Sequence, residues 1–204
     1  MSAIAGLLVA LSVTPAVAVT GLAAQNTISA FNGLPSYLKI QPLDQTSTIY
    51  AQENGKPVPI AKFFAQNRQD LTWDQVASVV KEAAVDTEDP HFYTEGGVDL
   101  TGTIRATLST ALGSGTQGGS SITQQYVKNV LVQRCDATYI NKSSSSAVTK
   151  AEQQKYENCY ADAAGTTVDR KLKEIRLAVG VNKAYTKKEI LMGYLNIKIG
   201  RAHV

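Results

Sequence analysis

Residues 118–129 read GGSSITQQYVKN, and this stretch predicts the start of a helix. Ser121 and Gln124 have the spacing of a capping box, in which each side chain bonds to the backbone N–H of the other residue. The apolar residues that follow recur at helical spacing, at Ile122, Tyr126, Val130 and Leu131. The sequence therefore predicts a helix with one face in the core.

Two further capping boxes, one on each side of this helix in the sequence, predict two more helices. Thr72 with Gln75 precedes apolar residues at helical spacing, namely Val76, Val79, Val80, Ala83 and Ala84. Pro90 ends that helix, because the residue before a proline avoids helical angles. Thr186 with Glu189 opens the other, whose apolar residues are Ile190, Leu191, Tyr194 and Leu195.

A fourth helix is predicted over residues 168–182. Its apolar stripe is expected to pack on the core and consists of Val168, Leu172, Ile175 and Val179. Arg170 and Glu174 fall on the opposite side of the helical wheel, where they are free for chemistry or for water. Four predicted helices make the fold class mainly α.

Residues 25–70 are predicted to form a membrane-proximal connector. Four prolines interrupt it, at Pro35, Pro42, Pro57 and Pro59. Asn54 followed by Gly55 is a strong signal for a hairpin turn. The flanking residues 47–51 and 58–64 can then pair as two short strands, so the connector is expected to contain a short β-hairpin.

Residues 1–24 are predicted to be a transmembrane anchor. None of the 37 charged residues precedes Lys39, and residues 3–24 are mostly apolar or small. At a rise of about 1.5 Å per residue, a helix of this length crosses a hydrocarbon core of about 30 Å. The alternative is a cleaved signal peptide, which would begin with basic residues, whereas no Lys or Arg precedes this run.

Residues 133–165 are predicted to be a surface excursion, because they show no comparable helical period and contain a run of serines. Cys135 and Cys159, the two cysteines of the chain, lie near its ends. An anchor would place the domain outside the cytoplasm, where disulfides form. A disulfide between these cysteines is the favoured interpretation, since a metal site would need more ligands nearby.

Composition and charge argue against several protein classes. A formal net charge of +3, two His and two Cys disfavour a strongly basic nucleic-acid binder and a multi-cysteine zinc module, so no nucleic-acid partner is expected. Within residues 168–188, seven basic side chains face two acidic ones. This excess suits an anionic, phosphate-bearing ligand, although a solvated helix face with an Arg170 to Glu174 pair explains the same spacing.

Three motifs, taken in order, resemble the peptidoglycan glycosyltransferases. They are EDPHFYTEGGVD at residues 88–99, GGSSITQQYVKN at residues 118–129 and RKLKEIRLA at residues 170–178. These enzymes are the transglycosylase domains of class A penicillin-binding proteins and their monofunctional relatives. The resemblance covers residues 71–197 and implies a mostly helical, lysozyme-like domain, which is incomplete here because the family's later motifs do not follow.

The resemblance implies polymerisation of lipid II into glycan strands, in which an acceptor 4-hydroxyl attacks the anomeric carbon of a donor on polyprenyl pyrophosphate. Glu88 matches the catalytic glutamate that takes the proton from that hydroxyl. Glu174 matches a second glutamate that orients the donor or helps to hold a divalent cation, Mg²⁺ or Mn²⁺; no organic cofactor is implied. The matched substrate-binding positions are Phe92, Ser120, Gln124, Gln125, Lys128, Arg170, Lys171 and Lys173.

The resemblance also implies a place in the cell. It suggests a single-pass protein of the bacterial cell membrane with its catalytic domain outside the cytoplasm, whose partners are lipid II, the growing glycan strand and membrane lipid. Two other functions stay open from the residues alone. One is a lysozyme-like glycan hydrolase, which also needs a carboxylic acid in a helical cleft. The other is an anchored scaffold that binds wall precursors without turnover.

The sequence departs from the family pattern at three points. Glu95 stands where the family usually has His. No transpeptidase motif of the S-D-N or K-T-G type is present, so no penicillin-binding transpeptidase domain is expected within this sequence. The family's later glycosyltransferase motifs are also missing, so polymerase activity is expected of the parent protein. Residues 199–204 read IGRAHV, the translation of a common sequencing adapter, and residues 198–204 are therefore expected to be a non-native tail.

Overall fold

The structure is a computed structural model that describes residues 29, 31–40, 45–64, 69–99, 119–143 and 149–200. Its contacts divide the chain into two units, Met1–Pro35 and Ser36–Val204. In the first unit the described part includes a helical turn at residues 31–33. The predicted anchor at residues 1–24 lies outside the described residues. Across the described part of the chain, no helix combines the length and the apolar character needed to cross a membrane.

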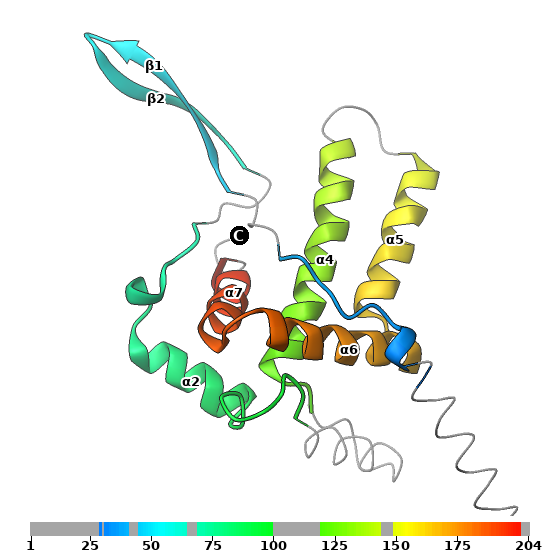
Figure 1. The fold of residues 1–204 in the computed structure, drawn as a ribbon. Helices are drawn as coiled ribbons and strands as arrows, with labels where there is room; N and C mark the ends of the chain where they lie inside the picture. The colour runs from blue at the N-terminus through cyan, green and yellow to red at the C-terminus, as the bar shows by residue number, and fades with distance from the viewer. Residues whose placement is uncertain are drawn as a thin grey trace, which may run out of the picture. The chain divides into compact units, whose positions relative to one another are not determined.

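The second unit is mainly helical, as predicted (Figure 1). Its two strands form one antiparallel sheet and come before the helices. In chain order the elements are β1 (Ser47–Glu53), β2 (Lys56–Phe63), the 3₁₀ helix η1 (Trp73–Gln75), α2 (Ser78–Glu88), α4 (Ile122–Ser143), α5 (Lys150–Ala164), α6 (Val168–Ala184) and α7 (Lys187–Gly200).

The predicted hairpin is present. Strands β1 and β2 pair with Glu53 opposite Lys56, so Asn54 and Gly55 form a two-residue turn. Both turn residues have positive φ, at 52° and 76°, which is the conformation that an Asn-Gly turn supplies. A bulge interrupts the register at Ile49, next to Tyr50. The prediction of this hairpin from its turn is thus confirmed.

The capping box at Thr72 opens a shorter element than predicted. Gln75 closes the box, but only the 3₁₀ turn η1 follows, because Val76 is extended at φ −93° and ψ 124°. Helix α2 then begins independently at Ser78. The helical phase therefore changes between Val76 and α2, and the predicted apolar stripe is only partly correct. Val76 is buried and Ala84 packs against the core, but Val79 is 65% exposed, and Val85, which was not predicted, is buried. The predicted end of α2 before Pro90 is confirmed.

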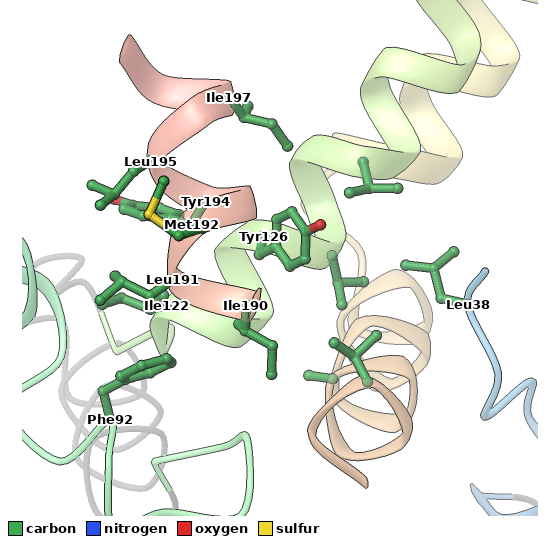
Figure 2. Packing of buried hydrophobic residues seen from close by; sticks show 14 of the residues in the cluster. Leu38, Phe92, Ile122, Tyr126, Ile190, Leu191, Met192, Tyr194, Leu195 and Ile197 are labelled. Carbon is green, nitrogen blue, oxygen red and sulfur yellow. The ribbon is translucent and has the colours of Figure 1, made fainter. Parts of the chain in front are cut away.

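Helices α4 and α7 form the centre of the main core. The α7 residues that were predicted to be buried are buried and pack with α4 residues (Figure 2), the set being Ile190, Leu191, Tyr194, Leu195, Ile122, Tyr126 and Val127. Gly193 allows the two helices to approach closely, since a Cβ atom there would lie 2.3 Å from the Tyr126 hydroxyl oxygen. Both capping boxes, at Ser121 and Thr186, are formed.

The apolar stripe predicted for helix α6 packs on the core only in its C-terminal half, where Ile175 and Val179 contact the main cluster. Val168 is 76% exposed and Leu172 is also exposed, so the N-terminal half of the predicted stripe faces solvent. The buried face carries Glu174, Leu177, Ala178 and Val181. The helical wheel does not predict this buried face, because it assigns only apolar side chains to the core. In the structure the charged side chain of Glu174 is buried, and its cationic partners compensate its charge.

The connector residues 36–40 pack against the helices. Leu38 is 3% exposed and belongs to the main core. The backbone N–H of Ile40 donates to the Tyr185 hydroxyl at 3.2 Å, and Arg134 of α4 donates to the Lys39 carbonyl. On α6, the absence of a side chain at Gly180 leaves room for the backbone that runs beside it. The start of the second unit is therefore held against α4 and α6.

Residues 133–165 are largely helical. The second half of α4 and all of α5 form an antiparallel pair (Figure 1). A disulfide joins Cys135 to Cys159 across this pair, with the Cα atoms 5.8 Å apart. Tyr156 stacks on Tyr139 with ring centroids 4.7 Å apart. Helix α5 begins at a capping box that the sequence analysis missed, because polar residues dominate this segment and give it a weak helical stripe.

Candidate functional site

The site begins at Glu88, the last residue of α2. Pro90 stops the helix, and the carboxylate of Glu88 is left exposed at its end. Its Oε2 accepts a hydrogen bond of 2.9 Å from the side-chain amide of Gln125 on α4. A residue of the first motif is thus attached to a residue of the second, 37 positions later.

Asp89, the next residue, has a different environment. Its side chain is 3% exposed, and its Oδ2 accepts a 2.9 Å hydrogen bond from the backbone N–H of Ile122, the first residue of α4. A carboxylate at a helix N-terminus satisfies a free N–H group and interacts favourably with the helix dipole. The two neighbouring acidic residues therefore have different roles. Asp89 positions α4, and the exposed carboxylate of Glu88 is accessible to a ligand.

The first turn of α4 positions the polar side chains that follow. Gln124 is fully buried, and its Oε1 accepts from the Ser121 N–H at 2.9 Å, so it closes the capping box. Gln125, one position on, is half-buried and also donates to the Ser120 carbonyl at 3.3 Å. The sequence motif thus supplies one structural glutamine and one that faces Glu88.

Helix α6 supplies the cations and the second glutamate. Lys171 donates to the Ser120 hydroxyl at 2.6 Å and is ion-paired with Glu174. Arg170 is ion-paired with the other oxygen of the same carboxylate. Glu174 is 4% exposed, while its two partners keep 13% and 30% of their side chains exposed. Two cations are therefore fixed in one geometry and still reach solvent.

These contacts form one continuous polar path between the two glutamates. It runs from Glu88 through Gln125 and Ser120 to Lys171, and then to Glu174. Residues from three separate motifs of the sequence are therefore brought together. Glu88 ends α2, Ser120 lies just before α4, Gln125 lies in the first turn of α4, and Lys171 and Glu174 lie in the N-terminal half of α6.

Besides the structural Gln124, three predicted binding residues lie outside this path. Phe92 is fully buried in the main core, at the edge of the cluster in Figure 2. Lys128 is half-buried on α4, one turn after Gln124. Lys173 lies on the outer side of α6, where it forms a 2.8 Å ion pair with Asp169 and keeps 48% of its side chain exposed.

Tyr194 is a neighbour of the site that the sequence analysis assigned only to the core. Burial raises its pKa to about 12, and the negative charge of Glu88 contributes to that rise. The phenol therefore stays protonated and lies within electrostatic range of the glutamate. Helical spacing could not reveal this, because a tyrosine in an apolar stripe gives the same pattern whether or not its hydroxyl reaches a functional group.

The residues around Glu174 do not match a resident metal site. Both carboxylate oxygens already bond to cationic side chains. Within the described ranges, no group of three or more His, Cys, Asp or Glu side chains could hold an ion. Mg²⁺ is commonly bound through one or two carboxylates together with substrate phosphates, so the donors of the protein itself are too few here.

The arrangement supports two kinds of chemistry. An exposed carboxylate held by an amide can accept a proton from a bound hydroxyl group. Two fixed cations nearby can bind an anion and stabilise negative charge that develops on it. The described part of the site is therefore suited to joining a hydroxyl nucleophile to a substrate that loses an anionic group.

Comparisons with known proteins place this site in context. The Transglycosylase family model matches residues 56–157 and 146–202. Penicillin-binding protein 1A of Mycobacterium tuberculosis is 33% identical over 156 residues, which cover 76% of this chain and 16% of that protein. Penicillin-binding protein 1A/1B of Bacillus subtilis is 35% identical over 154 residues, 74% of this chain and 13% of that protein.

A shorter relative has a higher identity over a shorter stretch of this chain. The monofunctional glycosyltransferase of Staphylococcus aureus strain JH9 is 39% identical over 123 residues, which cover 60% of this chain and 35% of that protein. The chain thus spans between about an eighth and about a third of the lengths of these relatives. No solved structure matches the chain significantly.

Proposed function

The chain belongs to the transglycosylase family, and we propose that it is part of an enzyme that polymerises lipid II into the glycan strands of peptidoglycan. The observation that carries this proposal is the polar path from Glu88 to Glu174, with its two cations. It provides a proton acceptor and an anion site on neighbouring helix ends, which are the two groups that glycosyl transfer from a pyrophosphate donor requires.

Glu88 is the proposed general base. Its carboxylate takes the proton from the 4-hydroxyl of the acceptor sugar, and the oxygen of that hydroxyl forms a bond to the anomeric carbon of the donor. A neutral alcohol is a poor nucleophile, and a positioned base typically contributes about 10²- to 10⁴-fold in rate. Gln125 supports this role, since its amide holds one oxygen of the carboxylate in place.

The leaving group is the polyprenyl pyrophosphate. The bond between the anomeric carbon and the phosphate oxygen breaks, and the electron pair stays on that oxygen. Arg170 and Lys171 are the proposed partners of the pyrophosphate, because charge-assisted hydrogen bonds stabilise negative charge as it forms. One displacement converts an α-linked donor into a β-linked product. Lys128 is proposed to bind the same substrate from α4.

Glu174 is proposed to act through its cationic partners. It is buried and holds Arg170 and Lys171 in one geometry, so the anion site exists before the substrate arrives. Such preorganisation avoids a reorganisation cost during the reaction. Because both oxygens of Glu174 are occupied by these cations, no step of the proposed mechanism passes through a metal ion.

The cellular setting is part of the same proposal. We infer that residues 1–24 anchor the protein in the bacterial cell membrane and that the helical unit lies outside the cytoplasm as part of a lysozyme-like domain. The apolar N-terminal sequence and the disulfide support this arrangement, since disulfides persist in oxidising compartments. Lipid II, the growing glycan and membrane lipid are the proposed partners.

The test compares two substrates. The full-length parent, purified in detergent, is incubated separately with lipid II and with finished glycan. We expect glycan chains to form from lipid II and finished glycan to stay intact. Cleavage of the finished polymer would instead establish a hydrolase. Binding of lipid II without product, unchanged by Glu88→Gln, would establish a precursor-binding scaffold.

A further inference from the structure

A small cavity lies between α4 and α5. It has a volume of about 100 Å³ and mainly apolar walls. At a rise of about 1.5 Å per residue, its first lining residue on α4, Cys135, lies about 15 Å along the helix from Gln125. Thr138, Lys155 and Cys159 also line the cavity and are exposed, so it opens to solvent. The cavity is therefore accessible, and it shares no residue with the polar path of the proposed site.

The walls of the cavity are fixed before any ligand binds. The disulfide between Cys135 and Cys159 joins the two helices beside it. Tyr139 and Tyr156 stack with their ring centroids 4.7 Å apart, and the Tyr156 hydroxyl donates to Oδ1 of Asp136 at 3.0 Å. Ordering of these side chains therefore costs a ligand little of its binding energy.

Polar side chains of the walls are already bonded within the protein. The Thr138 hydroxyl donates to the Arg134 carbonyl at 2.9 Å. The Glu152 carboxylate accepts from both the N–H and the hydroxyl of Thr149, each at 3.0 Å. A sugar in this cavity would leave hydroxyl groups without partners, which is unfavourable for each buried group. The walls therefore favour an apolar occupant.

The size of the cavity limits what that occupant can be. Its volume of about 100 Å³ is smaller than the roughly 150 Å³ of an apolar cavity that holds one benzene ring, and far below the roughly 300 to 1,000 Å³ of ordinary small-molecule pockets. One aliphatic side chain, such as that of Leu, Ile or Val, matches this space. A single side chain buried in a pocket is a common anchor at protein interfaces.

One cation at the mouth of the cavity is available to a ligand. Lys155 is exposed, and its ammonium group forms no ion pair with the residues that the structure describes. Glu152, the other charged residue of the lining, is held by Thr149 at the start of the same helix. An ammonium group forms charge-assisted hydrogen bonds with a carboxylate. The best-matched ligand therefore carries a carboxylate beside its aliphatic side chain.

The location of the cavity favours a partner over the substrate. The Transglycosylase family model matches the chain in two pieces, and the boundary between them, at residues 146–157, falls in the α4 and α5 pair. A feature that glycan polymerisation requires is expected within the continuous parts of the match. A site beside the interruption instead suits a ligand that is particular to this chain.

We propose that this cavity is the docking site of a protein partner. An aliphatic side chain of the partner enters the cavity, and Lys155 binds the carboxylate of an Asp or Glu next to it in the partner's sequence. The inference goes beyond the proposed function and does not depend on it, because no residue of the polar path takes part. The disulfide then maintains the shape of the docking site as well as the pairing of the helices.

Peptide selection tests the proposed chemistry without knowledge of the partner. The purified full chain is immobilised and used to select binders from random peptides displayed on phage, and Thr138→Phe, which fills the cavity, is used in parallel. Peptides retained only by the wild type should share Leu, Ile or Val next to Asp or Glu. A shared motif of another composition, or no peptide specific to the wild type, would overturn the proposal.

Affinity for one selected peptide tests the apolar contact. Fluorescence anisotropy should show a loss of at least about tenfold in Thr138→Phe. Asn158→Phe adds the same ring at an exposed position of α5 that does not line the cavity, and it should bind like the wild type. If Thr138→Phe does not fold, Ala in place of the aliphatic residue of the peptide should give a similar loss. Unchanged affinity for the filled cavity or for the Ala peptide would overturn the proposal.

Charge reversal tests the contact with Lys155. Lys155→Glu should lower affinity for the acidic peptide roughly fivefold. Lys150→Glu makes the same change at an exposed lysine of the same helix outside the lining, and it should have no such effect. Asn or Gln in place of the acidic residue of the peptide should abolish the difference between the wild type and Lys155→Glu. A difference that persists with that peptide, or none with the acidic one, would overturn the proposal.

Discussion

The Glu88 carboxylate accepts a 2.9 Å hydrogen bond from the Gln125 amide, which joins the end of α2 to the first turn of α4. The carboxylate is exposed, so the protein supplies its orientation through this bond rather than through burial. Gln125 in turn contacts the Ser120 carbonyl, whose residue also contacts Lys171. The proposed base and the proposed anion site are therefore positioned by the same short segment before α4.

Replacement of Gln125 tests this relationship. Gln125→Ala should lower kcat of the full-length parent roughly tenfold, because a hydrogen bond to a charged group contributes about 1.5 to 3 kcal/mol and this one is partly exposed. Lipid II polymerisation rates measure the effect. Gln153→Ala is the matched control, since Gln153 makes a similar bond to Glu157 on the surface of α5. Equal rates in Gln125→Ala and the control would contradict the orienting role.

Removal of the Lys171 charge tests the anion site. Lys171→Met keeps most of the aliphatic stem and removes the contacts to Ser120 and Glu174. We expect KM for lipid II to rise more than kcat falls, and stability to drop by about 1 kcal/mol, because Glu174 keeps Arg170 as a partner and Lys171 is partly exposed.

The control for this change is Lys183→Met, which removes an exposed charge at the far end of the same helix. It should leave both kinetic constants unchanged. Steady-state kinetics and thermal unfolding provide the measurements. A wild-type KM in Lys171→Met would argue against binding of the pyrophosphate at this position.

Reduction of the disulfide tests whether the proposed site works independently of the pairing between α4 and α5. Breaking the Cys135 to Cys159 bond should destabilise this pair by about 3 kcal/mol, the loop-closure contribution for a separation of 24 residues. Limited proteolysis should then cleave α5 first. Polymerisation by the parent should persist at moderate temperature, because the polar path uses the opposite end of α4. A double Cys→Ala variant that is unaffected by reductant is the control.

Local signals in the sequence predicted the boundaries of the structure well. Asn54 and Gly55 specified the hairpin because their positive φ angles fit a two-residue turn. The capping boxes at Ser121 and Thr186 marked the starts of α4 and α7, since those side chains bond the helix N-termini directly. Each of these signals acts over a few residues and is therefore visible without tertiary structure.

Burial was harder to predict, because it depends on partners that are distant in sequence. Val79 and Val168 lie on apolar stripes but face solvent. Glu174 lies on the side predicted to be polar and is buried between two cations. The hydrophobic pattern of the sequence does not show that a buried charge is paired with opposite charges. Such a charge is tolerated in the interior only because the fold brings its partners beside it.

The candidate site was predicted in part. The sequence motifs identified Glu88, Gln125 and Lys171, which the structure brings together. They did not reveal that Asp89 holds the start of α4, or that Tyr194 lies near Glu88. Both relationships join separate helices, and residue spacing within one helix contains no information about them.

The most direct test of the central claim is lipid II polymerisation by the full-length parent that carries Glu88→Gln. The amide keeps the size of the side chain but cannot take a proton, so glycan formation should fall at least about 10²-fold while the melting temperature stays that of the wild type. Glu82→Gln, an exposed change on the same helix, should polymerise normally. Glycan chains made by Glu88→Gln at the wild-type rate would contradict the account.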